Sequence, residues 1–287
     1  MIIASTLQKS FGPQTLFDDV SFLINKGERI GLVGKNGTGK STLFKMIMGE
    51  EKQDSGTLST PKGYKIGALD QHIHFTKPTV IDECIEALPT EKQWDHYKAE
   101  IILSGLGFSE QDFQKDPTTF SGGFQVRINL CKALLADPNM LLLDEPTNYL
   151  DILSLRWLKD YLNKWPGEMM LITHDRDFMD QVTTHTLGLH RRQARKVSGG
   201  TIKFYELIIQ EEETYEQTRK NLENKRKEMQ SLVDRFRAKA SKATMAQSRL
   251  KMMEKMGTME KLDTEKNLGF RFNHLPCPGK IIMTIKN

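Results

Sequence analysis

Gly34-Lys35-Asn36-Gly37-Thr38-Gly39-Lys40-Ser41 is the stretch that sets both the expected fold and the place of its chemistry. It matches the pattern G-x-x-x-x-G-K-[S/T], follows a predicted strand at 29–34 and opens a predicted helix at 40–49. Glycines at this spacing let successive backbone N–H groups wrap around phosphate oxygens at a helix N-terminus, where the helix dipole also favours anions. We expect Lys40 to reach the phosphates and the Ser41 hydroxyl to bind Mg²⁺. The flanking strand and helix favour this interpretation over a chance match in a glycine-rich turn.

The pattern around this loop alternates short apolar or β-branched runs with helical stretches over residues 1 to about 200. Such alternation predicts an α/β fold, in which helices pack on a mostly parallel sheet. Strands are expected at residues 2–8, 19–24, 29–34, 65–70, 139–144, 168–173 and 185–190. Helices are expected at residues 40–49, 79–88, 92–106, 122–136, 153–164 and 176–183.

Two carboxylates follow the apolar run at 140–143, which reads as a buried strand. In an open α/β sheet, the carboxyl end of such a strand lies beside a phosphate-binding loop. Asp144 is expected to hold Mg²⁺ through water, and Glu145 to orient and deprotonate an attacking water. Acidic strand ends are common, so this assignment depends on the glycine-rich loop that accompanies it.

Composition restricts the protein class. The chain has 287 residues, room for about two domains at ~150 residues each, and is 38% hydrophobic and 27% charged. These values exclude collagen-like, low-complexity and wholly disordered classes. The apolar runs are far shorter than the roughly 20 residues of a membrane-spanning helix, and no secretory leader is expected. Cys84, Cys131 and Cys277 form no C-x-x-C pattern, so we expect neither disulfides nor a zinc site, and a reducing cytosol.

Positive charge is concentrated in one segment. Residues 219–255 hold 12 Lys and Arg against 4 Asp and Glu, whereas residues 1–218 are acidic overall. This asymmetry suggests an anionic partner such as nucleic acid, although charge alone favours a solvated helix. An apolar or small residue recurs at every seventh position from Ile208 to Leu250 and forms one stripe along the helix. Lys225 and Lys239 interrupt the second apolar stripe that a long coiled coil requires. We therefore expect a two-helix antiparallel hairpin that turns near 238–243.

Three further motifs complete a family pattern. They are Phe120-Ser121-Gly122-Gly123-Phe124, Leu143-Asp144-Glu145-Pro146-Thr147-Asn148-Tyr149-Leu150-Asp151 and Ile172-Thr173-His174-Asp175. In order and spacing they resemble the signature motif, the Walker B motif with its D-loop, and the switch-histidine motif of ABC-type ATPases. Gln71 stands where that family has its Q-loop glutamine. Phe11 stands where the family stacks an aromatic ring on adenine, and its alternative is a buried core phenylalanine.

The resemblance implies a P-loop NTPase domain with a mixed sheet and a helical subdomain, which hydrolyses ATP with Mg²⁺. The implied catalytic residues are Glu145, His174 and Gln71, and the implied metal-binding residues are Ser41, Gln71 and Asp144. The implied nucleotide-binding residues are Phe11, Gly34, Asn36, Gly37, Gly39, Lys40, Ser41 and Thr42. In this family, Ser121, Gly122 and Gly123 grip the γ-phosphate of an opposing domain, and Asp151 contacts the opposing P-loop. Catalysis therefore needs a second ABC domain, either from the same protein or from another copy.

The basic segment resembles one branch of this family. Residues 236–251 look like the linker of ABC-F proteins, which join two ATPase domains without a membrane domain. In that branch the linker hairpin reaches between the ribosomal subunits toward the peptidyl-tRNA, and closure of the two domains by ATP sets its position. The implied partner is the ribosome, through rRNA and tRNA, in the cytoplasm. The expected RNA contacts are Arg235, Arg237, Lys239, Lys242, Arg249 and Lys251.

The resemblance divides the chain into an ATP-binding domain at 1–205, a helical hairpin linker at 206–266 and the beginning of a second ABC domain at 267–287. Tyr149 departs from the histidine usual in the D-loop of this branch, and Phe124 ends the signature where transporters commonly have glutamine. With its second domain cut short, the chain is expected either to pair head-to-tail with another copy or to hydrolyse ATP poorly.

Other functions stay open at this point. The main alternative is a nucleotide-binding subunit of an ABC transporter with a separate membrane protein, which has no need of the basic hairpin at 206–266. A third alternative is a fragment that only binds nucleotide or RNA. The presence of Lys40, Glu145 and His174 argues against a loss of ATP hydrolysis. Basic helices also follow DNA phosphates. The residues leave open the translational role and the choice of ATP over GTP.

Overall fold

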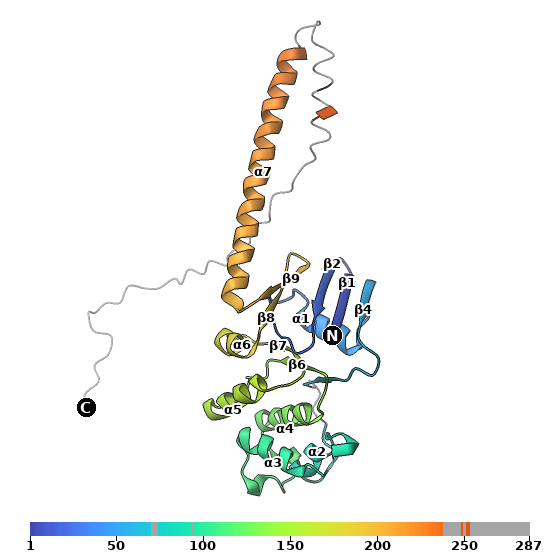
Figure 1. The fold of residues 1–287 in the computed structure, drawn as a ribbon, viewed down its shortest axis with the longest axis vertical. Coiled ribbons are helices and arrows are strands. Elements are labelled where there is room, and N and C mark those ends of the chain that lie inside the picture. The colour runs from blue at the N-terminus through green and yellow to red at the C-terminus, as the bar shows by residue number, and fades with distance from the viewer. Residues whose placement is uncertain (70–73, 93, 238–247, 249–250, 253–287) are drawn as a thin grey trace, which may run out of the picture. The chain divides into compact units, whose positions relative to one another are not determined.

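The computed structural model describes residues 1–69, 74–92, 94–237, 248 and 251–252, and it divides the chain into two units. Unit 1 comprises Met1–Ile208 and unit 2 comprises Ile209–Asn287. Unit 1 holds all the strands of the described residues, arranged in two sheets (Figure 1).

The larger sheet carries the phosphate-binding loop. Its strand order is β5-β6-β7-β3-β8-β9, and all neighbours are parallel except the antiparallel pair β8 and β9. A smaller antiparallel sheet has the order β2-β1-β4. In chain order the strands are β1 (Ile2–Phe11), β2 (Gln14–Ile24), β3 (Arg29–Gly34), β4 (Ser55–Ser59), β5 (Ile66–Ala68), β6 (Met140–Asp144), β7 (Glu168–Ile172), β8 (His185–His190) and β9 (Gln193–Ser198). The prediction of an α/β domain with a mixed sheet is confirmed.

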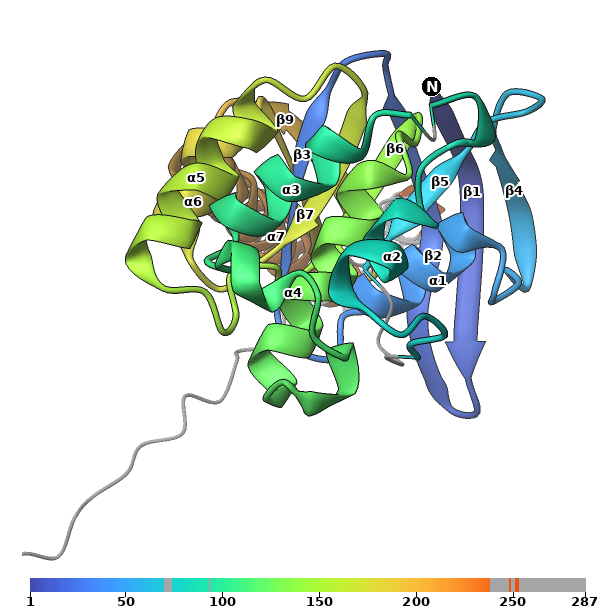
Figure 2. The same ribbon diagram turned by 90° about the horizontal axis from the view of Figure 1, so that it is seen from below.

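The described residues also form α-helices. They are α1 (Lys40–Met48), α2 (Val80–Ile85), α3 (His96–Gly105), α4 (Gly122–Leu135), α5 (Ile152–Asn163), α6 (Arg176–Val182) and α7 (Thr201–Arg237). In the part of the chain that the structure describes, short 3-10 helices lie at Thr90–Lys92, Glu110–Asp112 and Pro117–Thr119. Helices α2, α3 and α4 gather at the lower end of unit 1 in Figure 1 and face the viewer in Figure 2, and together they form the helical subdomain.

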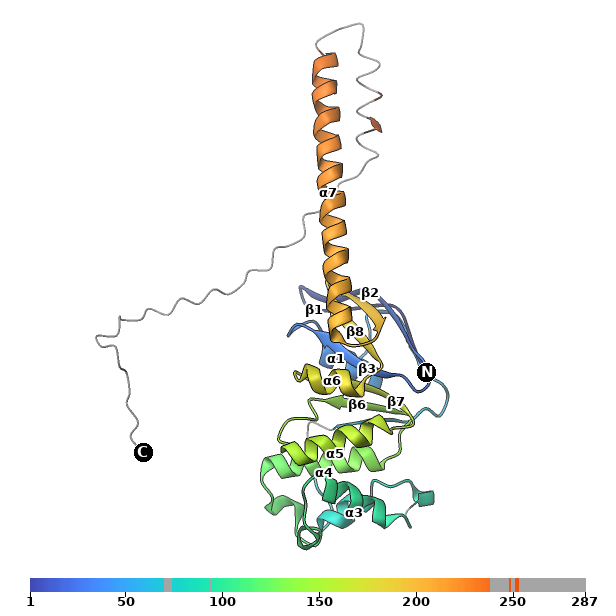
Figure 3. The same ribbon diagram turned by 60° about the vertical axis from the view of Figure 1, so that its left-hand side comes forward.

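The apolar character of β6 and β7 follows from their position between two cores. Successive side chains of a strand point to opposite faces, so a strand covered on both faces is apolar throughout. Leu141 and Leu143 belong to the core shared with α2 to α6, whereas Met140 and Leu142 belong to the core with α1 and the smaller sheet. Helices α3, α4 and α5 thus lie on one side of the larger sheet and α1 on the other (Figure 3). These layers hold the carboxyl ends of β3, β6 and β7 at one edge.

The start of α7 is fixed to unit 1. Asp180 on α6 accepts hydrogen bonds from the backbone N–H and the hydroxyl of Thr201, at 2.8 and 2.9 Å. Phe204 is buried against Gly188 on β8, where an added Cβ would lie 1.8 Å from the Phe204 ring. The helix therefore begins at Thr201, before residue 206, where the helical hairpin was expected to begin. The expected turn near 238–243 and most of the returning arm of the hairpin lie outside the described residues.

Several element boundaries differ from the predictions. Strands β4 and β9 were not expected, and the predicted helix at 92–106 begins only at His96, after the 3-10 helix that ends at Lys92. The turn between β8 and β9 has positive φ at Arg191 (48°) and Arg192 (64°). Glycine, asparagine or aspartate usually marks such a turn, and none stands here, so the sequence gives no hairpin signal.

Within the residues described, no helix is long and apolar enough to cross a membrane.

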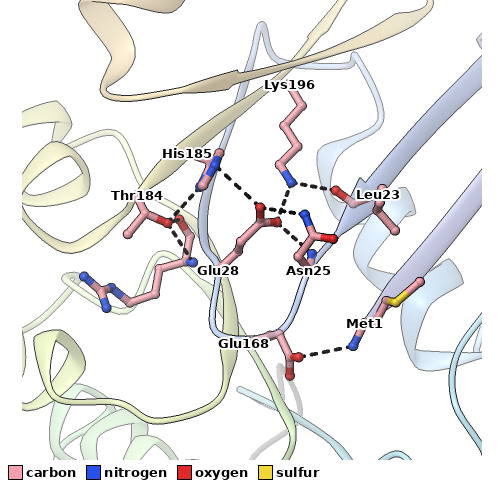
Figure 4. Close-up of polar contacts among 9 residues, drawn as sticks. Met1, Leu23, Asn25, Glu28, Glu168, Thr184, His185 and Lys196 are labelled. Carbon is pink, nitrogen blue, oxygen red and sulfur yellow. Dashed lines mark hydrogen bonds and ion pairs between the residues drawn. The ribbon is translucent and has the colours of Figure 1, made fainter.

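A half-buried carboxylate ties β3 to the antiparallel edge of the larger sheet (Figure 4). Glu28 precedes β3 and accepts hydrogen bonds from the backbone N–H and side-chain amide of Asn25, at 2.7 and 2.9 Å. It pairs with Lys196 on β9, and its Oε1 lies 3.5 Å from Nε2 of His185 on β8. Burial raises the pKa of Glu28, but the bonds from Lys196 and Asn25 outweigh it and lower the pKa to about 2.

Glu28→Gln is expected to lower the free energy of unfolding by about 3 kcal/mol at pH 7, because the carboxylate pKa falls from 4.5 to about 2 on folding and each pKa unit corresponds to about 1.4 kcal/mol. The folded pKa lies below the ordinary value of 4.5, so this contribution is present above pH 4.5 and is lost as the pH falls toward 2. Urea unfolding at pH 7 and pH 3 measures it, with exposed Glu100→Gln as control. An equal gap between wild type and Glu28→Gln at the two pH values would contradict this assignment.

Candidate functional site

The glycine-rich loop connects β3 to α1 in the conformation that the motif predicts. Gly37 and Gly39 have φ of +80° and +97°, in the left-handed region that glycine tolerates. An added Cβ at Gly39 would lie 2.8 Å from the Phe17 ring, whereas one at Gly37 would meet nothing within 4 Å. The backbone at Gly37 is therefore open to a ligand such as a phosphate, at the N-terminus of α1.

Lys40 closes the loop on itself. Its Nζ donates hydrogen bonds to the carbonyl oxygens of Gly34 and Lys35, at 2.7 and 3.0 Å. Burial lowers the pKa of Lys40, while the charges of Asp144 and Glu145 raise it. The ammonium thus lies beside two carboxylates, where a bound phosphate would add further negative charge.

The residues expected to hold a cation lie together. The Ser41 hydroxyl donates to Oδ2 of Asp144 at 3.3 Å, although the two are 103 residues apart. Burial raises the pKa of Asp144, and the Ser41 hydrogen bond and the charges of Lys40 and His174 lower it. A hydroxyl and a carboxylate are oxygen donors of the kind that Mg²⁺ prefers, so this pair fits the ion. Gln71, the third expected ligand, lies outside the described residues.

Glu145 and His174 also meet. Glu145 has a positive φ of 51°, and its backbone N–H donates to the Ile172 carbonyl at 2.8 Å. Its Oε2 accepts from the His174 backbone N–H at 3.3 Å, and its Oε1 lies 3.4 Å from His174 Nε2. The His174 side chain is 79% exposed, so it is not a core histidine. Non-glycine residues with positive φ often mark functional sites.

One cavity of about 440 Å³ collects most of these residues. Its lining includes ten of the expected site residues: Phe11, Asn36, Gly37, Gly39, Lys40, Ser41, Thr42, Asp144, Glu145 and His174. Gly34 lines a smaller cavity of about 150 Å³, which shares Lys40, Glu145 and His174. Phe11 is 48% exposed at the end of β1, so it is not a core residue. The Lys9 ammonium lies 4.9 Å from the centroid of the Phe11 ring, and the ring also lines the cavity, where it can stack on a planar ligand.

The signature residues do not line this cavity. Ser121 precedes α4 as its N-cap residue, and Ser121 and Gly122 are exposed. Asp151 caps α5, where its Oδ1 accepts from the Ser154 backbone N–H at 2.9 Å. Its Oδ2 also forms an ion pair with Nη1 of the buried Arg127, at 3.1 Å. Arg127 was not among the site residues expected from the sequence. The described chain therefore presents a nucleotide face and a separate signature face.

The expected RNA contacts fall mostly outside the described structure. Arg235 and Arg237 belong to α7, without described side chains, and Lys251 is exposed. Lys239, Lys242 and Arg249 lie outside the described residues.

Matches to known proteins extend over both the α/β domain and the basic segment. Two family models with the description "ABC transporter" match residues 17–148 and 187–272. The first covers the glycine-rich loop, the signature and the two carboxylates, and the second covers α7 and the basic segment. A solved structure of the ATP-binding subunit of an ABC transporter matches 69% of this chain and 90% of its own chain, with a TM-score of 0.61 and 22% identity. This likeness concerns the fold.

Curated relatives match almost the whole chain. "Probable ATP-binding protein YheS" of Escherichia coli K12 is 31% identical over 97% of this chain and 49% of its own length. "ATP-binding cassette sub-family F member 3" of Rattus norvegicus is 30% identical over 92% of this chain and 42% of its own length. The chain thus spans about half the length of these relatives.

Proposed function

Because this chain belongs to the ABC-F family of ATP-binding cassette proteins, we propose that it binds and hydrolyses ATP with Mg²⁺ and acts on the ribosome. Its unit 1 is an ABC ATPase domain. The cavity in which Lys40, Asp144, Glu145 and His174 meet is the observation that carries the ATPase part of this proposal.

In the proposed complex with ATP, Phe11 stacks on the adenine and the loop from Gly34 to Ser41 encloses the phosphates with its N–H groups. Lys40 exchanges its two carbonyl partners for phosphate oxygens. Ser41 and Asp144 hold the Mg²⁺, which neutralises phosphate charge. Glu145 accepts a proton from the attacking water, and His174 donates a hydrogen bond to the γ-phosphate.

We infer that a second ABC domain completes this site, supplied by the rest of the protein or by another copy. Three large side chains around Asp151 are exposed: Tyr149 is 68%, Ile152 71% and Leu153 77% exposed. Contiguous exposed apolar groups of this kind mark protein interaction surfaces. Such a surface suits a partner domain whose bound nucleotide lies against Ser121, Gly122 and Gly123 of this chain.

The ribosomal part of the proposal is supported by the likeness that extends into the linker and by the concentration of positive charge at 219–255. Arg and Lys on a helix neutralise RNA phosphates, and Arg also stacks on unpaired bases. We propose that the linker reaches rRNA and tRNA from a cytoplasmic protein, and that the nucleotide state of unit 1 sets its position.

Sedimentation with 70S ribosomes tests this proposal. Binding is expected with ATP, is strengthened by Glu145→Gln, and falls between 50 and 200 mM salt as phosphate contacts are lost. The double variant Lys239→Glu/Lys242→Glu should weaken binding by about tenfold or more. The matched control Lys26→Glu/Lys62→Glu reverses two exposed charges in unit 1 and should leave binding unchanged. Equal binding by the two double variants would contradict a linker contact with RNA.

A further inference from the structure

We propose that Arg127 is a positioning residue that holds the D-loop, residues 148–151, against the signature helix α4, so that both meet the opposing nucleotide as one rigid face. The inference rests on the proposed function and deepens it, because it names the residue that orders the half of the site offered to a partner.

Arg127 uses all three guanidinium nitrogens. Its Nε and Nη2 both donate to the Tyr149 carbonyl oxygen, at 3.0 and 2.6 Å. Its Nη1 donates to the Leu106 carbonyl oxygen at 2.8 Å and to Oδ2 of Asp151 at 3.1 Å. The residue is only 7% exposed. One buried side chain therefore connects α4, the end of α3 and the D-loop.

The signature motif and the D-loop also touch directly. An added Cβ at Gly123 would lie 3.2 Å from the Cβ of Tyr149. The Arg127 guanidinium carbon lies 4.7 Å from the ring centroid of Phe124, the residue after Gly123. Arg127 thus reaches the last residue of the signature on one side and the D-loop carbonyl on the other, through a cation–π contact and a fork of hydrogen bonds.

The D-loop needs such an external restraint. Tyr149 has φ of +66°, a conformation that a bulky non-glycine residue adopts only when its surroundings impose it. The Ser154 backbone N–H and the Arg127 guanidinium hold the pKa of Asp151 below its usual range. Both contacts orient the Asp151 carboxylate, which is 54% exposed and so is available to a partner.

Neither Arg127 nor its partners Leu106, Tyr149 and Asp151 line the nucleotide cavity. Loss of Arg127 should therefore leave ATP binding by the same chain intact and act on the nucleotide of the opposing domain. A lysine keeps the charge but has no planar fork, so it cannot reproduce the paired bonds to Tyr149.

Hydrogen exchange on the full chain tests the restraint without any need for turnover. In Arg127→Gln, amides at 149–155 should exchange at least ten times faster, while ATP protects amides at 36–42 as in wild type. Arg127→Lys should give an exchange rate at 149–155 between those of wild type and Arg127→Gln. Because it keeps the positive charge, it also provides a test if Arg127→Gln does not fold. Arg156→Gln removes an exposed charge from α5 and should change nothing. Unchanged exchange at 149–155 in both Arg127 variants would overturn the proposal.

A mixing experiment tests whether Arg127 acts across the interface. Arg127→Gln and Lys40→Ala are each expected to have less than a tenth of wild-type turnover. In a mixed pair, the intact phosphate loop of the Arg127→Gln chain faces the intact D-loop of the Lys40→Ala chain. An equal mixture should therefore regain about a quarter of wild-type turnover, because half of the pairs are mixed and each has one competent site.

The outcomes separate the two proposals. No recovery in this mixture, when wild type mixed with Lys40→Ala is active, would overturn the action of Arg127 across the interface. If wild type itself does not turn over ATP, the proposed ATPase activity of the chain fails. The exchange rates at 149–155 then decide for or against the restraint on their own.

Discussion

Glu145→Gln is expected to lower ATP turnover by about 1,000-fold while ATP affinity changes less than threefold. General-base catalysis contributes about 10² to 10⁴ in rate, and the amide cannot accept the proton of the attacking water. The substitution keeps the size of the side chain and the backbone bond to Ile172 that fixes the strained position of Glu145. Steady-state phosphate release and equilibrium dialysis with ATP measure the two quantities.

The control for this variant is Glu50→Gln, which neutralises an exposed glutamate just after α1. It should retain wild-type turnover. Because Glu145→Gln binds ATP but does not consume it, any ATP-dependent association of the chain should persist longer, as light scattering would show. Turnover within tenfold of wild type would exclude Glu145 as the base.

Lys40→Ala is expected to weaken ATP binding by about 100-fold or more. Hydrogen bonds from an ammonium to an anion contribute about 1.5 to 3 kcal/mol each, and Lys40 is placed to make more than one with the phosphates. Asp144 and Glu145 would also face the phosphates without the neighbouring positive charge. Isothermal titration of the chain with ATP and Mg²⁺ measures the change.

Lys45→Ala is the matched control, because it removes an exposed ammonium from the same helix. It should bind ATP as wild type does. Lys40→Ala also frees the carbonyls of Gly34 and Lys35, so thermal unfolding of both variants should accompany the titration. An affinity within threefold of wild type for a folded Lys40→Ala would refute the assignment of the loop.

Local patterns predicted much of the fold. Continuous apolar runs indicated β6 and β7, and the glycine-rich loop indicated the join of β3 to α1, because backbone geometry there depends on neighbours within a few residues. Strand β9 was missed because its residues are mostly polar. Its extended conformation depends on antiparallel pairing with β8, which the local sequence does not indicate. The early start of α7 was missed because its cap comes from Asp180 on another helix.

The site residues also fall into those that the sequence predicted and those that only the structure identified. Its motifs and residue types were readable in the sequence, from the loop at 34–41 to His174. The sequence offered no sign of Arg127, whose importance arises from contacts with carbonyls 21 and 22 residues away. Cys84 and Cys131 likewise stand far apart in the chain but lie in the same core as free thiols.

The sequence by itself therefore determined the family, the phosphate-binding loop and the chemical groups available for hydrolysis, since these depend on residue identity and short-range backbone geometry. Only the tertiary structure decided which groups share a cavity. The parallel order β6-β7-β3 brings Ser41 within 3.3 Å of Asp144 and leaves the signature on a separate face. The physical reason is that long-range strand order and helix packing are set by burial of apolar faces, which no short motif specifies.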